Sequence, residues 1–285
     1  GSPEGAESAF FPMQTDFIVG LSFGQVGTVA SVGYRGQVRH PELQEGAPHE
    51  HALLDSLISR EHYLYWRSEG SGPYVRAGRF YAPYGLRLAE HNAYIRRYLG
   101  SNIMEESYGL SGGIVETAWE AHLTAFISDP LRGSGRDEVG VAGLYERRIG
   151  DHVIAGQSRV TVADSDIRAL AGGYAKLWLE PLHLLWMTEL DVGRQAFREI
   201  DGGDRWQLAA YTGPVYNPLQ GLYVGAAYEL YDSDLKVTDV TRQALSSWVS
   251  YLPWAHVEVM GSIRGQLAGP SDGAVVGLLQ LHYYL

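Results

Sequence analysis

The chain contains no cysteine among its 285 residues, so it can form no disulfide, and it has no Cys-x-x-Cys-His motif to attach a c-type haem. No segment approaches the 18 consecutive apolar residues of a membrane-spanning helix, although 45% of the residues are hydrophobic. Positive charge is also scarce, because 22 Lys and Arg stand against 33 Asp and Glu, giving a formal net charge of −11. Nucleic acid requires a basic face, so this balance argues against a nucleic-acid partner.

Sequence signatures of catalysis, metal binding and export are missing as well. No Gly-x-Ser-x-Gly nucleophile motif occurs, and we predict no enzymatic activity and no cofactor. His49-Glu50-His51 offers two imidazoles in an acidic loop, but no tetrahedral ligand set accompanies them, so no metal site is predicted. Residues 1–14 lack the basic and apolar parts of a signal peptide, which is typical of a mature chain.

Glycine and aromatic residues are abundant, with 35 Gly, 19 Tyr and 7 Trp. Glycine suits tight turns and close strand packing. Aromatic rings with a polar end suit the two interfaces of a membrane, where one end is apolar and the other wet. This composition is consistent with a membrane protein that carries its apolar residues on alternate positions of strands.

Alternating apolar and polar residues recur in segments of about ten residues. In the segment 256–266, for example, Val257, Val259 and Ile263 alternate with Glu258 and Arg264. The predicted strands are 15–25, 28–39, 58–69, 74–81, 108–117, 119–128, 139–148, 153–163, 169–179, 182–193, 206–216, 222–231, 244–252, 256–266 and 275–285. Their apolar faces are those of a membrane barrel, whereas the alternative, a soluble β-sandwich or propeller, should carry charged outer faces.

Connections between these segments alternate between two lengths, tight turns such as 69–73, 217–220 and 252–253, and longer polar loops such as 129–138. The fold class predicted is therefore all-β, an antiparallel up-and-down transmembrane β-barrel. Because single-chain bacterial barrels have an even number of strands, the count must be 14 or 16. Either a short strand lies within 8–14, or 15–25 is not a full strand.

The last thirteen residues, 273–285, alternate to the end of the chain, with Val275, Leu279 and Leu281 on one side and Gln280 and His282 on the other. This ending resembles the C-terminal strand of Gram-negative outer-membrane β-barrels, although it finishes on Leu285 rather than on Phe or Trp. The resemblance implies the cell outer membrane as location, with its lipid and lipopolysaccharide as partners. It divides the chain into an N-terminal periplasmic segment, 1–14, and a barrel, 15–285.

The polar strand faces, opposite the apolar ones, are predicted to line a lumen. They carry charges of both signs, as an aqueous pore requires. The alternative is that these charges merely pair with one another and solvate the wall. The predicted lumen-lining residues are Arg35, Glu61, Arg67, Glu120, His122, Arg148, Arg159, Lys176, Glu189, Asp191, Glu229, Glu258 and Arg264.

A long segment, 83–106, leaves a strand at Pro83 and runs without alternation. It is semi-apolar, and with the end of the preceding strand it forms the most basic stretch of an acidic chain. We predict that it folds into the barrel and narrows the pore, where its cations favour anions. The alternative is a loop that caps the barrel and bridges anionic lipid or Glu105 and Glu106. The predicted pore-constriction residues are Arg79, Arg87, His91, Arg96 and Arg97.

The run Gly78-Arg-Phe-x-x-Pro-Tyr-Gly-Leu-Arg87 resembles a Gly-Arg-Phe-x-x-Pro-Phe-Gly stretch of outer-membrane porins and of the barrels in porin–cytochrome conduits. The porin resemblance implies passive diffusion of small hydrophilic solutes or ions. The conduit resemblance implies an alternative function, a sheath around a periplasmic multihaem cytochrome. A third alternative is an outer-membrane barrel enzyme, whose Ser and His residues would meet only in space.

Overall fold

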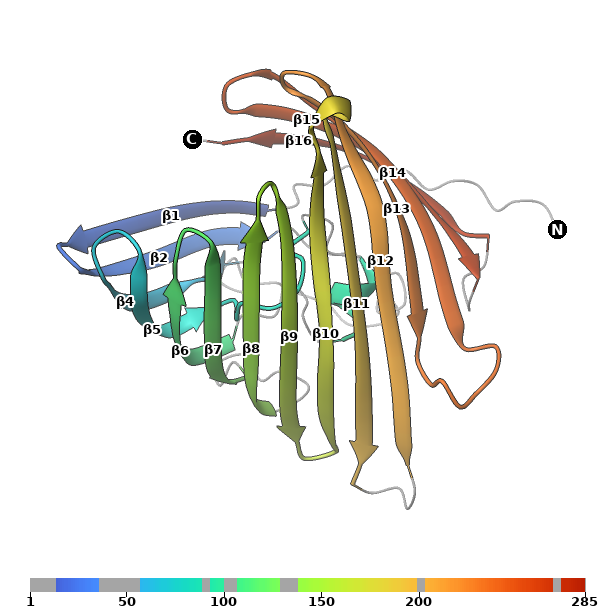
Figure 1. Ribbon diagram of the computed structural model, residues 1–285, viewed down its shortest axis with the longest axis horizontal. Helices are drawn as coiled ribbons and strands as arrows, with labels where there is room; N and C mark the ends of the chain where they lie inside the picture. The colour runs from blue at the N-terminus through green and yellow to red at the C-terminus, as the bar shows by residue number, and fades with distance from the viewer. Residues whose placement is uncertain are drawn as a thin grey trace, which may run out of the picture.

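The computed structural model describes residues 14–35, 57–88, 93–99, 107–128, 138–198, 203–268 and 273–284. They form one antiparallel sheet of 16 strands, curled into a trough (Figure 1). The strands are β1 (Gln14–Phe23), β2 (Val26–Arg35), β3 (Leu57–Ile58), β4 (His62–Arg67), β5 (Gly72–Phe80), β6 (Ser107–Val115), β7 (Trp119–Ile127), β8 (Glu138–Ile149), β9 (His152–Ala163), β10 (Asp166–Leu179), β11 (Leu184–Phe197), β12 (Asp204–Leu219), β13 (Leu222–Asp232), β14 (Thr241–Trp254), β15 (Val257–Ala268) and β16 (Val275–Tyr283). Two short helical turns, α1 (Tyr94–Arg97) and η3 (Glu180–Leu182), complete the described elements.

Apart from the two-residue β3, each strand pairs with the strands next to it along the chain, which confirms the predicted all-β, antiparallel up-and-down class. The strand count is 16, one of the two predicted numbers, but β3 and β4 both pair with β2, so fifteen positions follow one another. The idea that 15–25 is not a full strand is wrong, because β1 pairs with β2 along its whole length. Residues 8–13 lie outside the described part of the chain.

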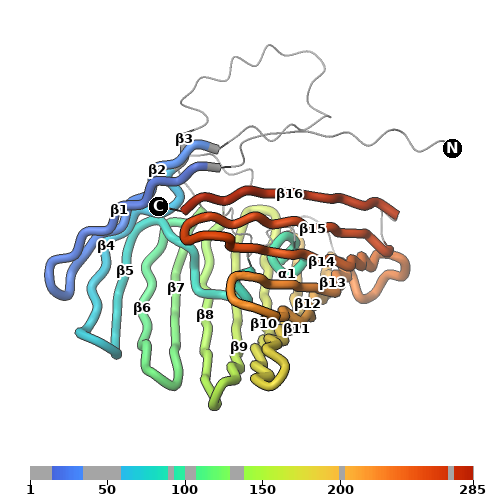
Figure 2. The backbone as a smooth tube through the Cα atoms, turned by 90° about the horizontal axis from the view of Figure 1, so that it is seen from above, coloured from blue at the N-terminus to red at the C-terminus, as the bar shows by residue number. Residues whose placement is uncertain are grey.

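The path from β1 to β16 contains fifteen strands, and each runs antiparallel to the one before it. Because fifteen is odd, the two edge strands run in the same direction. Viewed from above, the sheet curls until β16 comes round towards the first strands (Figure 2). Within the described residues, no pairing joins β1 to β16. Among these residues, no helix is long and apolar enough to cross a membrane.

The distribution of apolar and charged side chains between exposed and buried positions is the reverse of that in a soluble protein. Large apolar side chains on one sheet face are exposed, for example Leu279 at 78% and Leu281 at 73%. Carboxylates on the other face are buried, with Asp191 at 0% and Glu229 at 1%. Because a soluble sandwich buries its apolar faces, this distribution matches a barrel whose outer face meets lipid.

Turn positions differ from the sequence prediction at two prolines. Pro218 and Pro253 lie within β12 and β14 rather than in turns. Proline has no N–H for the strand ladder, and the pairing register shifts at both places, between Tyr216 and Leu219 and between Tyr251 and Trp254. The reversals follow at Gln220-Gly221 and at Ala255-His256, where Gly221 and His256 have φ of 79° and 71°.

The segments 81–88 and 93–99 lie inside the trough. The helical turn α1 contacts β11, β12 and β13 on their concave side (Figure 2). Both segments therefore lie against the concave face of the sheet.

We expect Gly213→Val in β12 to destabilise the folded barrel. A Cβ at Gly213 would lie 2.1 Å from the Ala226 carbonyl oxygen and 2.8 Å from the Ala227 Cα, backbone atoms that cannot move aside. Overpacking of this kind costs about 1–3 kcal/mol. The measurement is the temperature at which the folded barrel loses its heat-modifiable mobility in gel electrophoresis. Gly156→Val in β9 is the control, because nothing lies within 4 Å of its Cβ; equal melting of the two variants would contradict the prediction.

Candidate functional site

Apolar side chains attach the inner segment to the barrel wall. From the segment, Leu86, Leu88, Tyr94, Ile95 and Leu99 are buried together with Ala93. Their partners in the wall are Leu144, Leu170, Tyr174, Ala209, Tyr211, Ala227, Tyr231 and Ala244. The inner face is therefore not uniformly polar, since it carries an apolar patch on β8 and β10–β14 that the segment covers.

Two wall side chains hold the backbone of the segment by hydrogen bonds. The N–H of Leu86 donates to Glu189 Oε2 at 2.6 Å, and the N–H of Gly85 donates to Gln157 Oε1 at 2.7 Å. The amide of Gln157 also donates to Glu189 Oε1 at 2.7 Å and to Asp191 Oδ1 at 2.8 Å. Both carboxylates are buried, and these donors satisfy both oxygens of Glu189 and one of Asp191, whereas Asp191 Oδ2 has no hydrogen-bond partner among the described residues.

Gly85 makes this contact possible. Its φ is +67°, and a Cβ there would lie 2.7 Å from Glu189 Oε1. A side chain at this position would both strain the backbone and push the segment away from Glu189.

A third carboxylate holds the other end of the segment. The N–H of Tyr94, in the first turn of α1, donates to Glu229 Oε2 at 2.6 Å. Arg264 donates to both oxygens of Glu229, so the carboxylate is shared between wall and segment. The Arg264 guanidinium also lies over the Tyr94 ring, 4.8 Å from its centroid. Removal of Glu229 would therefore leave two sets of buried donors without an acceptor.

Aromatic stacking fixes the end of α1. The Tyr98 ring stacks on Tyr231 of β13, with centroids 4.5 Å apart and planes at 17°. Arg242 of β14 donates to the Tyr98 hydroxyl at 2.9 Å. Within the segment, Arg96 donates to the Leu88 carbonyl. The segment is thus anchored along most of its described length.

Protonation within the segment follows from burial. Burial, and then the charges of Asp191 and Glu189, raise the pKa of Tyr84, so this hydroxyl stays neutral and donates to Asp191 Oδ1 at 3.4 Å. Burial lowers the pKa of Arg96, although an arginine retains its proton at any physiological pH.

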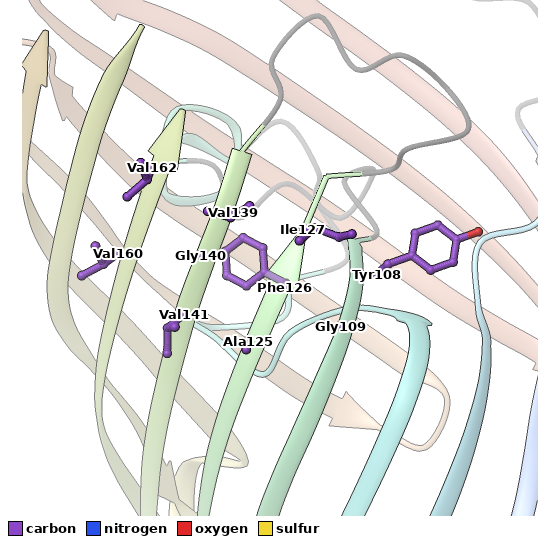
Figure 3. Close-up of a pocket in the computed structure, with 10 residues that line it drawn as sticks. All are labelled: Tyr108, Gly109, Ala125, Phe126, Ile127, Val139, Gly140, Val141, Val160 and Val162. Carbon is purple, nitrogen blue, oxygen red and sulfur yellow. The ribbon is translucent and has the colours of Figure 1, made fainter. Parts of the chain in front are cut away.

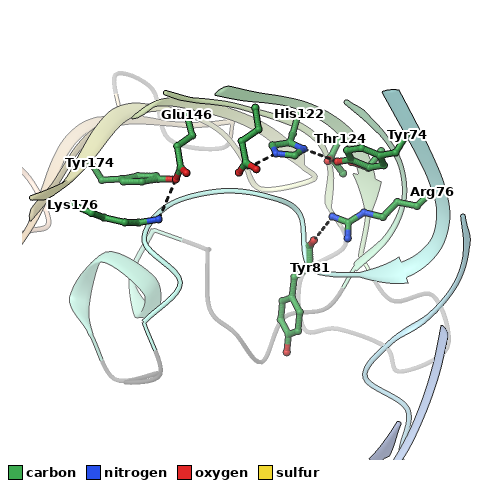
Figure 4. Close-up of polar contacts among 10 residues, drawn as sticks. Tyr74, Arg76, Tyr81, His122, Thr124, Glu146, Tyr174 and Lys176 are labelled. Carbon is green, nitrogen blue, oxygen red and sulfur yellow. Dashed lines mark hydrogen bonds and ion pairs between the residues drawn. The ribbon is translucent and has the colours of Figure 1, made fainter. Parts of the chain in front are cut away.

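The wall from β5 to β10 carries a row of polar contacts (Figure 4). Tyr174 and Lys176 contact Glu146 Oε2 at 2.5 and 3.1 Å, and His122 Nε2 lies 3.3 Å from Glu120 Oε1. The other ring nitrogen of His122 bonds to the Tyr74 hydroxyl at 2.7 Å. Glu120 and Glu146 therefore each have a nitrogen partner.

Arg76 and Arg87 differ from this pattern, because neither forms an ion pair with any described residue. Arg76 donates to the Tyr81 carbonyl at 3.0 Å. Arg87, from the inner segment, is exposed and lies close enough to Arg76 and Glu120 to act on both electrostatically. The inner segment and the wall of β5 thus present two unpaired cations to each other.

The predicted constriction residues occupy different places. Arg87 and Arg97 are exposed, whereas Arg96 is buried and bonded to the segment itself. Arg79 is 6% exposed and pairs in register with His62 and Tyr108, so it shares their strand face and not that of Arg76. His91 lies outside the described residues. Only Arg87 is therefore observed next to charged side chains of the β5–β7 wall.

Most predicted lumen residues are half-buried or buried on the concave face. Those with inner-face contacts are Glu120, His122, Arg159, Lys176, Glu189, Asp191, Glu229, Glu258 and Arg264. Arg67 and Arg148 share register with the inward positions Tyr74 and Val153 and are exposed at strand ends. Glu61 precedes β4, and its carbonyl accepts the Ser31 N–H at 2.7 Å. The side chain of Arg35 lies outside the described part.

Sequence reasoning missed Arg76, Tyr84, Tyr98 and Arg242. Arg76 had a usable signal, since it stands two residues from Tyr74 in an alternating segment and so shares its face. Tyr84 and Tyr98 lie in a segment without periodicity, and their partners are more than 100 residues away. Nothing in the local sequence could have paired them.

Among the described residues, a serine and a histidine are in contact, or share a carboxylate, in two places. Ser59 Oγ lies 2.9 Å from His62 Nδ1, and His62 Nε2 bonds to the Tyr108 hydroxyl at 2.9 Å, not to a carboxylate. Ser250 and His282 both bond to Glu258, at 2.5 and 3.0 Å. In the first set the imidazole lacks an acidic partner, and in the second the serine is bonded to the acid itself, which differs from the Ser–His–Asp arrangement of hydrolases.

A hollow of about 550 Å³ lies on the convex side, between β6 and β9 (Figure 3). It is lined mainly by outward apolar side chains, among them Val139, Val141 and Val160, which are half exposed. It is therefore part of the apolar outer surface and separate from the polar network.

No family model matches the chain, and no curated protein matches it. Solved structures share the fold over 95% of this chain. They include a loop-deletion form of OmpT, an outer membrane protein of Vibrio cholerae (9% identity, 90% of that chain, TM-score 0.66), and an anion-selective porin from Comamonas acidovorans (11%, 89%, 0.67). A triple mutant of the Rhodopseudomonas blastica porin is also similar (12%, 89%, 0.55). The fold is that of Gram-negative outer-membrane β-barrels.

We expect Glu189→Leu to loosen the inner segment. The change leaves the Leu86 N–H and one Gln157 donor bond without an acceptor, a cost of about 1–3 kcal/mol. Trypsin should then cut after Arg87 roughly ten times faster, because each 1.4 kcal/mol changes an opening equilibrium tenfold. Glu180→Leu, in the exposed turn η3, is the matched control. Identical cleavage rates in the two variants would show that Glu189 does not hold the segment.

Proposed function

We propose that this protein is an outer-membrane channel for passive diffusion of small hydrophilic solutes and ions, with a preference for anions. The observation that carries the proposal is the pair of unpaired cations, Arg76 on the wall and Arg87 on a segment that the opposite wall holds in place. The shared fold with porins supports the channel, and one of those similar structures is itself described as an anion-selective porin.

Passage through such a lumen depends on water and on wall charge. A water-filled lumen removes the cost of moving an ion into lipid, and unbalanced wall charges raise the local concentration of the opposite ion. Lys176 balances the charge of Glu146, whereas His122 is a hydrogen-bonding partner of Glu120 that carries a charge only when its ring is protonated. Arg76 and Arg87 have no ion-pair partner among the described residues, and we infer that these two cations attract anions to this part of the lumen.

The position of the segment favours a channel over a cytochrome sheath. Its apolar residues are buried against β8 and β10–β14, in space that a protein partner inside the barrel would need. A channel uses the same segment as a constriction. The serine–histidine geometries give no comparable support to the third alternative, a barrel enzyme.

Single-channel recording in a planar bilayer with a salt gradient tests the proposal. The purified chain should give stable open steps and a reversal potential that indicates anion preference. The double variant Arg76→Gln, Arg87→Gln should move that potential towards the cation side, because the two unpaired charges are gone. Arg147→Gln removes one charge from the exposed face that also carries Trp119, and should leave selectivity unchanged.

Two results would contradict the proposal in different ways. A folded, heat-modifiable barrel without conductance would contradict the channel hypothesis, and the sheath or the enzyme would then be the better hypothesis. Conductance with the same selectivity in the double variant would retain the channel but would show that the permeating ions do not pass Arg76 and Arg87.

A further inference from the structure

The inner face of β4 and β5 combines arginine with an unusual amount of aromatic surface. Tyr63 and Tyr65 of β4 face the same side as Tyr74 and Arg76 of β5, because Tyr65 is paired with Arg76 and Tyr63 lies two residues from it. The Arg76 guanidinium lies 5.7 Å from the Tyr63 centroid, 6.0 Å from that of Tyr74 and 4.1 Å from that of Phe80. Arg67, at the end of the strand, lies over Tyr65 at 5.7 Å.

Two of the rings lie across the wall and do not project from it. A Cβ at Gly27 of β2 would lie 2.4 Å from the Cζ and hydroxyl atoms of Tyr65, so the end of that ring covers the glycine. In the same way, a Cβ at Gly113 of β6 would lie 2.7 Å from Tyr74 Cε1. The glycine on the neighbouring strand thus leaves the space in which each ring lies flat against the wall. The rings then present their faces to the lumen.

The arginine in the middle of this surface remains available for a ligand. Arg76 donates to the Tyr81 carbonyl and hydrogen-bonds Tyr63, but its buried Nε has no hydrogen-bond partner and it forms no ion pair within the described residues. The charged groups that act on it are Arg87 of the inner segment and Glu61, which forms no ion pair with it. A guanidinium that is flanked by ring faces suits a ligand that has a carboxylate at one end and a flat ring at the other.

We infer that the wall of the passage carries a binding site for small aromatic carboxylates, formed by Arg76, Tyr63, Tyr65 and Tyr74. This inference rests on the channel proposed above. The carboxylate pairs with Arg76, and the ring stacks on Tyr65 or Tyr63. Such a site concentrates one class of organic anion at the constriction, in addition to the general attraction that any anion feels there.

Benzoate and cyclohexanecarboxylate separate this site from a merely basic or merely apolar surface. The two probes have the same charge and nearly the same size, but only benzoate is flat. Aromatic stacking should make benzoate bind about threefold to tenfold more tightly. If apolar burial alone mattered, cyclohexanecarboxylate would bind at least as well. The measurement is calorimetric titration of the folded chain in detergent micelles, which requires no conductance.

Substitutions assign the two parts of the site. Arg76→Gln should weaken both probes alike. Tyr65→Leu should bring the ratio of the two affinities to about one, and Gly27→Val should do the same by lifting the ring from the wall. Tyr145→Leu, on the exposed outer face of β8, is the control and should retain the wild-type ratio.

The outcomes separate this inference from the channel itself. Equal affinities for the two probes in the wild-type chain, or a ratio that survives both Tyr65→Leu and Gly27→Val, would overturn the aromatic site. If benzoate shows the predicted preference while the bilayer recordings stay silent, the site stands and the channel fails. If the chain conducts but does not prefer benzoate, the channel stands and the site fails.

Discussion

Backbone hydrogen bonding in a medium without water is the constraint on which the rest of this structure depends. Inside lipid, each N–H and C=O must find a partner within the protein, and a sheet of neighbouring antiparallel strands supplies one. That requirement explains why the strands of the described residues, apart from the short β3, pair with one another in chain order. It also forces every strand to place alternate side chains in lipid and in the interior, which produces the reversed polarity of the two faces.

A charged interior then creates its own requirement, because buried carboxylates need donors. On β11 the successive inward positions are both acids, Glu189 and Asp191, and they are tolerated because Gln157 donates to both. Further donors come from the inner segment, as the N–H groups of Leu86 and Tyr94 and the hydroxyl of Tyr84. The segment therefore supplies hydrogen-bond donors to the carboxylates of the wall, and the wall supplies acceptors to the backbone of the segment.

The sequence predicted the parts of the fold that depend on short-range pattern. The period-two alternation of segments such as 256–266 is a direct consequence of a strand with two different faces, so the class and most strand positions could be predicted. The prolines at 218 and 253 were misplaced because a bulge and a turn use the same residue types, and only the register distinguishes them. The inner segment was recognisable from its lack of alternation, but its contacts were not. Glu229 and Tyr94 are 135 residues apart, and no local signal links a carboxylate on a strand to one particular backbone N–H.

In the channel proposed above, one-sided docking of the segment brings Arg76 and Arg87 together on one side of an acidic chain. The deepest acids face the segment; they are Glu189, Asp191 and Glu229. They accept hydrogen bonds from its N–H groups, from Gln157 and from Arg264. The remaining side of the proposed lumen is bounded by β4–β8, where Glu120 and Glu146 have nitrogen partners and Arg76 has no carboxylate partner among the described residues. The docked segment adds Arg87 to that side. A net charge of −11 therefore says little about the charge along the proposed passage, because the three deepest acids are buried beneath the segment that they hold.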